Sequence, residues 1–215
     1  HRVLGRLIGL VFIFPFLWFL VRKKLSAPLI KRLVIILVLG GSQGLLGWFM
    51  VKSGLIDVPR VSHFRLAAHL MTAFLTMSVI YWVVLELRFQ KPSKEIKLTK
   101  FKGWNISLLV LLTLQIMYGA FVAGKDAGLM HNTWPLMNGH FVHPSAVALD
   151  SIWESLTYNS SMIQFVHRSL AIILFVFVLS IKWESIKKGI SGPLKQTYTA
   201  LAVVVVVQFI LGVFT

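Results

Sequence analysis

Residues 162–181 read MIQFVHRSLAIILFVFVLSI, so His167 and Arg168 are embedded in an otherwise mainly apolar run. An α-helix needs about 20 mainly apolar residues to cross the hydrocarbon core of a bilayer. This run meets that length, and five other runs in the chain resemble it. The sequence therefore predicts an all-α, polytopic transmembrane helical bundle. The six predicted spans are residues 3–21, 33–51, 66–85, 104–123, 162–181 and 198–215.

The composition agrees with this interpretation. The chain has 215 residues, of which 57% are hydrophobic and 13% charged, whereas soluble domains are roughly 25% charged. A soluble globular enzyme is thereby disfavoured. The chain has no cysteine, which excludes a disulfide framework, an iron-sulfur cluster on this chain and thiolate ligation of haem. Metal chemistry must then rest on His, Met or carboxylate side chains.

The net charge is +15, and the distribution of the basic residues indicates how the chain is oriented in the membrane. Successive connections between the spans carry five, three, six, one and four Lys+Arg residues, which is the alternation that the positive-inside rule predicts. The first span then starts on the outer side, and the second and fourth connections are outer loops. No span has the pattern of a cleavable signal peptide. We expect membrane lipid, and no nucleic acid, as the partner of the basic residues.

The fourth connection, residues 124–161, is too long for a tight turn. It contains aromatic residues and prolines, including Trp134, Pro135 and Trp153. Two interpretations stay open. It is either a structured outer lid or an amphipathic loop that rests on the membrane interface.

Two motifs recur at one spacing. The sequence His-Arg-x-Leu occurs at residues 1–4 and 167–170, and Gln-x-x-Leu-Gly-x-Phe occurs at 43–49 and 208–214. The offsets, 166 and 165, predict two duplicated halves in parallel order, residues 1–103 and 104–215. A counterpart of His69 would then fall near residue 234 or 235, and a counterpart of span 104–123 before His1. We therefore expect a fragment of an eight-span protein with two four-helix halves.

Three histidines lie near the outer ends of predicted spans: His1, His69 and His167. An ionisable residue inside a span is a functional hypothesis by default. Haem iron takes axial imidazoles from neighbouring helices, and His1 with His69 would provide such a pair. The alternative is that each imidazole only bonds to a neighbouring helix.

Arg2 and Arg168 each follow one of these histidines. A guanidinium there would suit either a haem propionate or a lipid phosphate. The other four histidines are expected in outer loops, without metal-ligand spacing, and the last two would suit zinc only with further ligands. They are His63, His131, His140 and His143.

Three glutamines, Gln43, Gln115 and Gln208, each stand four residues before a glycine. As polar groups inside spans they need partners, and bonding between helices is the expected role. The glycines indicate surfaces for close helix contact. Such a smooth surface would also accept a flat macrocycle.

Taken together, these residues resemble the haem A synthase family of the mitochondrial and α-proteobacterial kind, over about 170 of the 215 residues. The matching stretches are His1-Arg2-x-x-Gly5-Arg6-Leu7-x-Gly9, Gln43 to Lys52 with Ser53-Gly54-Leu55, Pro59-Arg60-Val61-Ser62 with Arg65-Leu66-Ala67-Ala68-His69, Gly119 to Gly128, Asn132-x-x-Pro135-x-Met137, and Gln164-Phe165-x-His167-Arg168.

The resemblance implies an eight-helix membrane oxidoreductase that converts the C8 methyl of haem O to a formyl group, giving haem A for the terminal oxidase. It implies that His1 and His69 ligate the substrate haem in the first half. His167 would be one ligand of a haem B in the second. The cofactor would be haem B, with haem O and haem A as substrate and product. The membrane would be the bacterial inner (plasma) membrane or the mitochondrial inner membrane.

The family places a glutamate three residues before its first histidine, and that position precedes His1. The catalytic residue is therefore unknown in this chain, which we expect to be inactive alone. Gln164 is the equivalent in the second half and is neutral. The resemblance also implies a haem O synthase and an external electron donor, ferredoxin-like or a quinol, as partners. A homo-oligomer is a further possibility.

Two other functions compete with this one. A di-haem cytochrome b type carrier would also use paired histidines, but only to shuttle electrons. A transporter with parallel repeats would have paired helices and intramembrane polar residues without haem.

Overall fold

The computed structural model describes residues 2–54, 61–89 and 99–214. The helices are α1 (Arg2–Val21), α2 (Ala27–Gly54), α3 (His63–Arg88), α4 (Thr99–Gly124), α5 (Ile152–Tyr158), α6 (Ser160–Lys187) and α7 (Gly192–Phe214), with short 3-10 helices η1 (Ala127–Leu129) and η2 (Pro144–Val147). Across these three described ranges, six helices are long and apolar enough to cross a membrane. The prediction of a polytopic helical bundle is confirmed.

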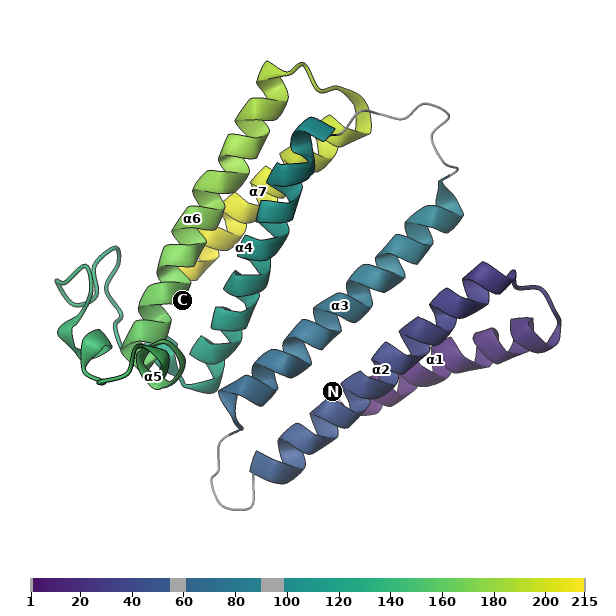
Figure 1. The fold of residues 1–215 in the computed structure, drawn as a ribbon, viewed down its shortest axis with the longest axis horizontal. Helices are drawn as coiled ribbons and strands as arrows, with labels where there is room; N and C mark the ends of the chain where they lie inside the picture. The colour runs from purple at the N-terminus through teal and green to yellow at the C-terminus, as the bar shows by residue number, and fades with distance from the viewer. Residues whose placement is uncertain (1, 55–60, 90–98, 215) are drawn as a thin grey trace. The chain divides into compact units, whose positions relative to one another are not determined.

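The chain forms two compact units, His1–Glu95 and Ile96–Thr215. In the first unit α2 packs between α1 and α3, and in the second α6 packs between α4 and α7 (Figure 1). Within each unit, neighbouring long helices run in opposite directions. Many large apolar side chains on these helices are exposed, including Val3, Trp18 and Phe214. Such a surface suits lipid, because exposed apolar patches of this extent are rare on soluble monomers.

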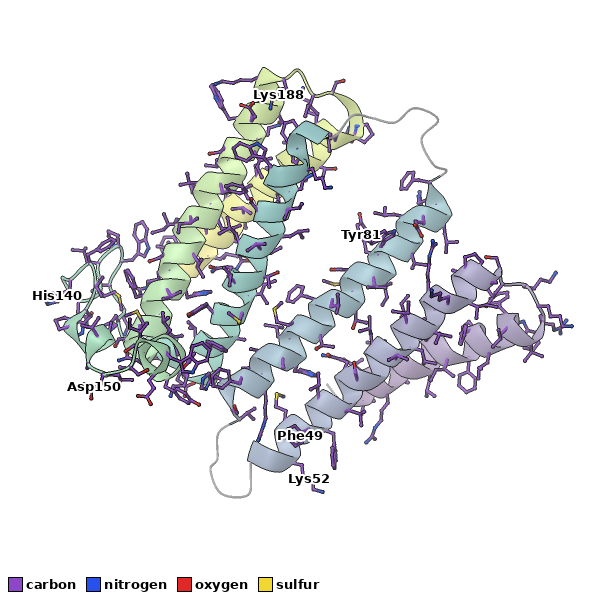
Figure 2. All side chains as sticks on the ribbon, in the orientation of Figure 1. Phe49, Lys52, Tyr81, His140, Asp150 and Lys188 are labelled. Carbon is purple, nitrogen blue, oxygen red and sulfur yellow. The ribbon has the colours of Figure 1, made fainter. Side chains whose placement is uncertain are left out.

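Polar contacts tie α2 to α3 at both ends. Arg65 near the start of α3 lies over the ring of Phe49 near the end of α2, at 4.7 Å from its centroid (Figure 2). At the other end Arg32 forms an ion pair with Glu86. The two helices are therefore held in register along their length.

The apolar core of the second unit lies around α6. In the most apolar stretch of α6, 22% of the residues are buried, whereas only 6% are buried in the corresponding stretch of α1. Val178 and Ile181 on α6 are both 1% exposed. They pack with Tyr198 and Ala202 of α7 and with Phe101 of α4. Because α6 is the central helix, a side chain on its first turns is placed more firmly than one on an outer helix.

Residues 125–159, here called the lid, connect α4 to α6 and contain η1, η2 and α5. The lid sits at the end of the unit where α6 begins (Figure 1). Asn159 caps α6, its side-chain oxygen accepting from the amides of Ser161 at 2.9 Å and Met162 at 3.1 Å. The connection is structured, with helices and capping hydrogen bonds, and both interpretations of its position relative to the membrane stay predictions.

We predict that the lid faces the outer side of the membrane. Asp150 lies in the lid and Lys188 follows the opposite end of α6 (Figure 2). The chain has no cysteine, so Asp150→Cys and Lys188→Cys can each be labelled alone. A membrane-impermeant maleimide added from outside should label Asp150→Cys at once and Lys188→Cys only after permeabilisation. The reverse pattern would invert the orientation derived from the basic residues.

Candidate functional site

The first unit places His69 of α3 against α2. Nε2 of Gln43 lies 3.3 Å from Nε2 of His69 and donates to the His69 carbonyl at 3.0 Å. An amide nitrogen only donates, so the ring nitrogen facing it is unprotonated. That is the form of imidazole that binds a metal.

Gly47, one turn after Gln43 on α2, lies against the same ring. A Cβ built on Gly47 would be 3.1 Å from Cε1 of His69, closer than side-chain carbons normally approach. Residues four apart share a helix face, so the amide and the bare backbone form one surface for the imidazole. This is the physical reason for the Gln-x-x-x-Gly spacing.

The second unit builds the same arrangement from α4 and α6. Nε2 of Gln115 lies 3.2 Å from Nδ1 and 3.4 Å from Nε2 of His167. A Cβ on Gly119 would be 3.3 Å from Cε1 of that ring. The expected bonding of Gln43 and Gln115 between helices is confirmed.

Several buried polar atoms of these two sites have no hydrogen-bond partner: Gln43 Oε1, His69 Nδ1 and Gln115 Oε1. Leaving a buried polar group unpaired costs about 1–3 kcal/mol. Unpaired acceptors and donors beside an imidazole are expected where a polar ligand binds.

The residues fit a metal that is already bound in a planar macrocycle. No group of three or more His, Cys, Asp or Glu side chains that could hold a bare ion occurs among the residues searched in the described ranges. A haem needs only axial imidazoles from the protein. A Cβ on Gly47 or Gly119 would meet only atoms of the imidazole, so these glycines let His69 and His167 lie close to the neighbouring helix. The two imidazoles provide the kind of ligand that haem iron takes.

Gln208 and Gly212 of α7 repeat the same spacing. Nothing lies within 4 Å of a Cβ built on Gly212, and Gln208 is exposed. Gln208 and Gly212 therefore repeat the spacing of the other two sites. Among the described residues, no histidine ring packs against Gly212.

The residues of the first predicted pair are only partly placed. His69 lies where the sequence placed it, on the helix face toward α2. His1 lies outside the described residues, and so does the side chain of Arg2 at the start of α1. The pairing of His1 with His69 therefore stays a prediction.

The prediction that His63 lies in an outer loop was wrong. His63 is the first residue of α3, and it is 6% exposed, with its ring 4.2 Å from that of Phe64. Hydropathy places the start of this span at Leu66, after the charged Arg65. It cannot detect a polar first turn that continues the helix. His131, His140 and His143 do lie in the connection, as predicted.

Arg168 and Gln164 of α6 bind the lid, which the sequence did not reveal. Arg168 donates to the carbonyls of His131 at 2.6 Å and Thr133 at 2.9 Å. Gln164, 3% exposed, donates to the carbonyls of Gly128 at 3.1 Å and His131 at 3.0 Å. These contacts involve backbone carbonyls, which carry no residue-specific signal, so no motif could have predicted them.

The lid carries a buried imidazole of its own. His131 is 3% exposed, and its Nε2 lies 3.0 Å from Oγ of Ser161. Its Nδ1 lies 3.2 Å from the amide nitrogen of Asn138, so Nδ1 is an acceptor and His131 is neutral. The His143 ring packs against it, with centroids 4.4 Å apart. Burial lowers the pKa of His131, and the nearby charges of His143 and Arg168 lower it further.

Comparison with known proteins agrees with the resemblance noted in the sequence. The family model COX15-CtaA, described as cytochrome oxidase assembly protein, matches residues 1–215. Proteins named heme A synthase from Flavobacterium psychrophilum, Flavobacterium johnsoniae and Rhodospirillum centenum are 45%, 44% and 41% identical over the whole chain. The chain spans 63%, 63% and 58% of their lengths. No solved structure matches.

We predict that the lid loosens in acid. The pKa of His131 lies below its ordinary value of 6.5 in the closed lid, so an open lid binds a proton more readily. The stabilisation is complete above about pH 6.5 and is lost as the pH falls through that value. Each unit of pKa difference changes the opening equilibrium about tenfold. Hydrogen exchange of amides 126–140, corrected for intrinsic rates, measures this opening.

The exposed His140 provides the matched control for this measurement. His131→Gln should remove most of the pH dependence of lid opening, whereas His140→Gln should retain it. Equal pH dependence in the wild type and in His131→Gln would contradict the assignment to His131.

Proposed function

Because this chain belongs to the COX15-CtaA family of cytochrome oxidase assembly proteins, we propose that the protein acts as a haem A synthase. It is then a membrane oxidoreductase that oxidises the C8 methyl of haem O to a formyl group, giving haem A. The relatives that carry the name heme A synthase support this activity, and they match over the full chain. Six apolar spans place the chain in a membrane as a multi-pass protein.

The observation that carries the proposal is the repeated glutamine, glycine and histidine arrangement. It occurs once in each unit, at Gln43, Gly47 and His69 and again on α4 and α6. A protein that handles two haems needs two such imidazole surfaces. An enzyme that binds a metal ion without a macrocycle does not need an imidazole packed against a glycine in each unit. A transporter does not need one either.

The two haems are assigned as follows. His1 and His69 hold the substrate haem in the first half, and His167 holds a haem B in the second. Gln208 and Gly212 on α7 repeat the spacing of the other two sites, and a second imidazole for haem B is proposed to face them. This assignment follows the duplicated order of the motifs.

Arg2 and Arg168 bind haem propionates in this proposal. A guanidinium has five N–H donors. Two bonds from Arg168 reach lid carbonyls, so further donors are left for a carboxylate. Since that side chain is half-buried beside His167, such a bond would be stronger than one in water.

Bound haem supplies the redox chemistry, because no side chain oxidises an unactivated methyl group. The protein's residues orient the rings and exclude water. His69 and His167 would each hold a haem by its iron, the glycines let each imidazole lie against the neighbouring helix, and the lid covers the start of α6.

The proton chemistry belongs to the first half. The family's carboxylate would stand three residues before His1, outside this chain. Gln164 takes the equivalent place before His167 and donates to two lid carbonyls, which an ionised carboxylate cannot do. In this proposal the second half therefore carries electrons.

The remaining partners follow from the reaction. Haem O must come from a haem O synthase, and electrons must be exchanged with an external partner, ferredoxin-like or a quinol. The bacterial inner membrane or the mitochondrial inner membrane is the location where the product would be used. A homo-oligomer is compatible with the exposed apolar helix faces.

We predict that His167→Ala in the full protein abolishes the haem B signal and spares the substrate haem. The reason is that His167 is the imidazole that α6 contributes to the second unit. Visible absorption and pigment extraction after expression with a haem O producer measure both haems and the formylated product. Loss of both signals together would assign the residue to folding.

The same pigments separate the competing functions. A protein with two haems and no formylated product would be an electron carrier of the cytochrome b type. Absence of a Soret band with sufficient haem supply would remove both haem functions and leave the transporter.

We predict that Gly119→Ala lowers haem B occupancy several-fold, because its Cβ would press on Cε1 of His167 from 3.3 Å. Gly103→Ala on the same helix is the matched control, since nothing lies within 4 Å of its Cβ. Both changes raise helix propensity equally, by about 1 kcal/mol. Gly47→Ala should lower substrate haem in the same way. Equal haem occupancy in all three variants would contradict the proposed role of the glycines.

A further inference from the structure

Two side chains of α6 hold three carbonyls of the lid. Gln164 donates to Gly128 and His131, and Arg168 donates to His131 and Thr133. The carbonyl of His131 thus accepts from both side chains, at 3.0 Å from Gln164 and 2.6 Å from Arg168. The stretch 128–133 is thereby fixed to one helix at three points.

The two donors bracket His167 on one face of α6. Gln164 and Arg168 are four residues apart, so they lie above one another on the helix, and His167 is three residues after Gln164. The imidazole and its neighbours therefore share about one turn of α6. Any rotation of that turn moves the ring relative to Gly119 and Gln115.

The turn needs an external tie, because it lies close to the end of its helix. α6 begins at Ser160, and the first N–H groups of a helix have no partner within it. Asn159 caps that end through its side-chain oxygen and also donates to the Ser145 carbonyl at 2.7 Å. The lid and the first two turns of α6 are therefore cross-linked from several directions.

We propose that Gln164 and Arg168 form a clamp that fixes the lid to α6 and so sets the orientation of the His167 imidazole. They are positioning residues for that ligand. This inference deepens the proposed function, since the effect on a haem presupposes haem at His167. The mechanism requires donors at both positions. Glutamate at 164 would face two carbonyls without a proton to donate, and lysine at 168 lacks the planar fork that reaches two carbonyls.

The test uses the full-length protein loaded with haem and compares Gln164→Glu and Arg168→Lys with the wild type. Gln196→Glu is the matched control, because Gln196 is exposed on α7. Hydrogen exchange of amides 126–140 reports the clamp. The electron paramagnetic resonance spectrum of the low-spin haem whose signal His167→Ala removes reports the orientation of the axial imidazole.

Both clamp variants should raise exchange of the lid amides about tenfold or more, the scale of one hydrogen bond to a charged or buried group. They should also shift and broaden the largest g value of that haem, while Gln196→Glu changes neither. Arg168 is also assigned to a haem propionate, so Gln164→Leu, which removes the donor without adding a charge, decides the question if Gln164→Glu does not fold.

Unchanged exchange would overturn the clamp. Faster exchange with an unchanged haem spectrum would overturn the positioning role and leave a lid anchor alone. If the proposed function is wrong, the result is different: the wild-type protein shows no haem signal that His167→Ala removes. The positioning role is then refuted as well. Hydrogen exchange of the lid amides in the same samples still shows whether the clamp exists.

Discussion

The arrangement depends on one close contact, an imidazole held against the bare backbone of a glycine on the neighbouring helix. Inside an apolar span a histidine needs partners for its ring nitrogens, since unpaired polar groups there are costly. The glutamine one turn before the glycine supplies one, at 3.3 Å in the first unit. A residue larger than glycine would push the ring away from that amide. In both units the spacing of four residues places the glutamine amide and the glycine against one imidazole.

The two units reach this contact along different chain paths. In the first, Gln43 and His69 are 26 residues apart, because α3 follows α2 after a short connection. In the second, Gln115 and His167 are 52 apart, because the lid lies between α4 and α6. The contact is kept although its sequence separation doubles. By the repeat offset, α6 matches α1 and α7 matches α2, so the two contacts join different helix pairs of the repeat.

The lid gives Gln164 and Arg168 of α6 a structural role. Its carbonyls at residues 128, 131 and 133 require donors from α6, and Gln164 and Arg168 provide them. An amide at the position before the histidine thus has a structural role that a carboxylate cannot take over. The amide of Gln164 is thus committed to the lid.

The sequence by itself determined the membrane class and the existence of six spans. These depend on local properties, namely run length, charge alternation and repeated motifs. Only the tertiary structure decided which glutamine faces which histidine, that His63 begins a helix, and that Arg168 binds the lid. Each of these depends on contacts between helices or with backbone carbonyls far apart in the chain, and such contacts leave no periodic trace in the sequence.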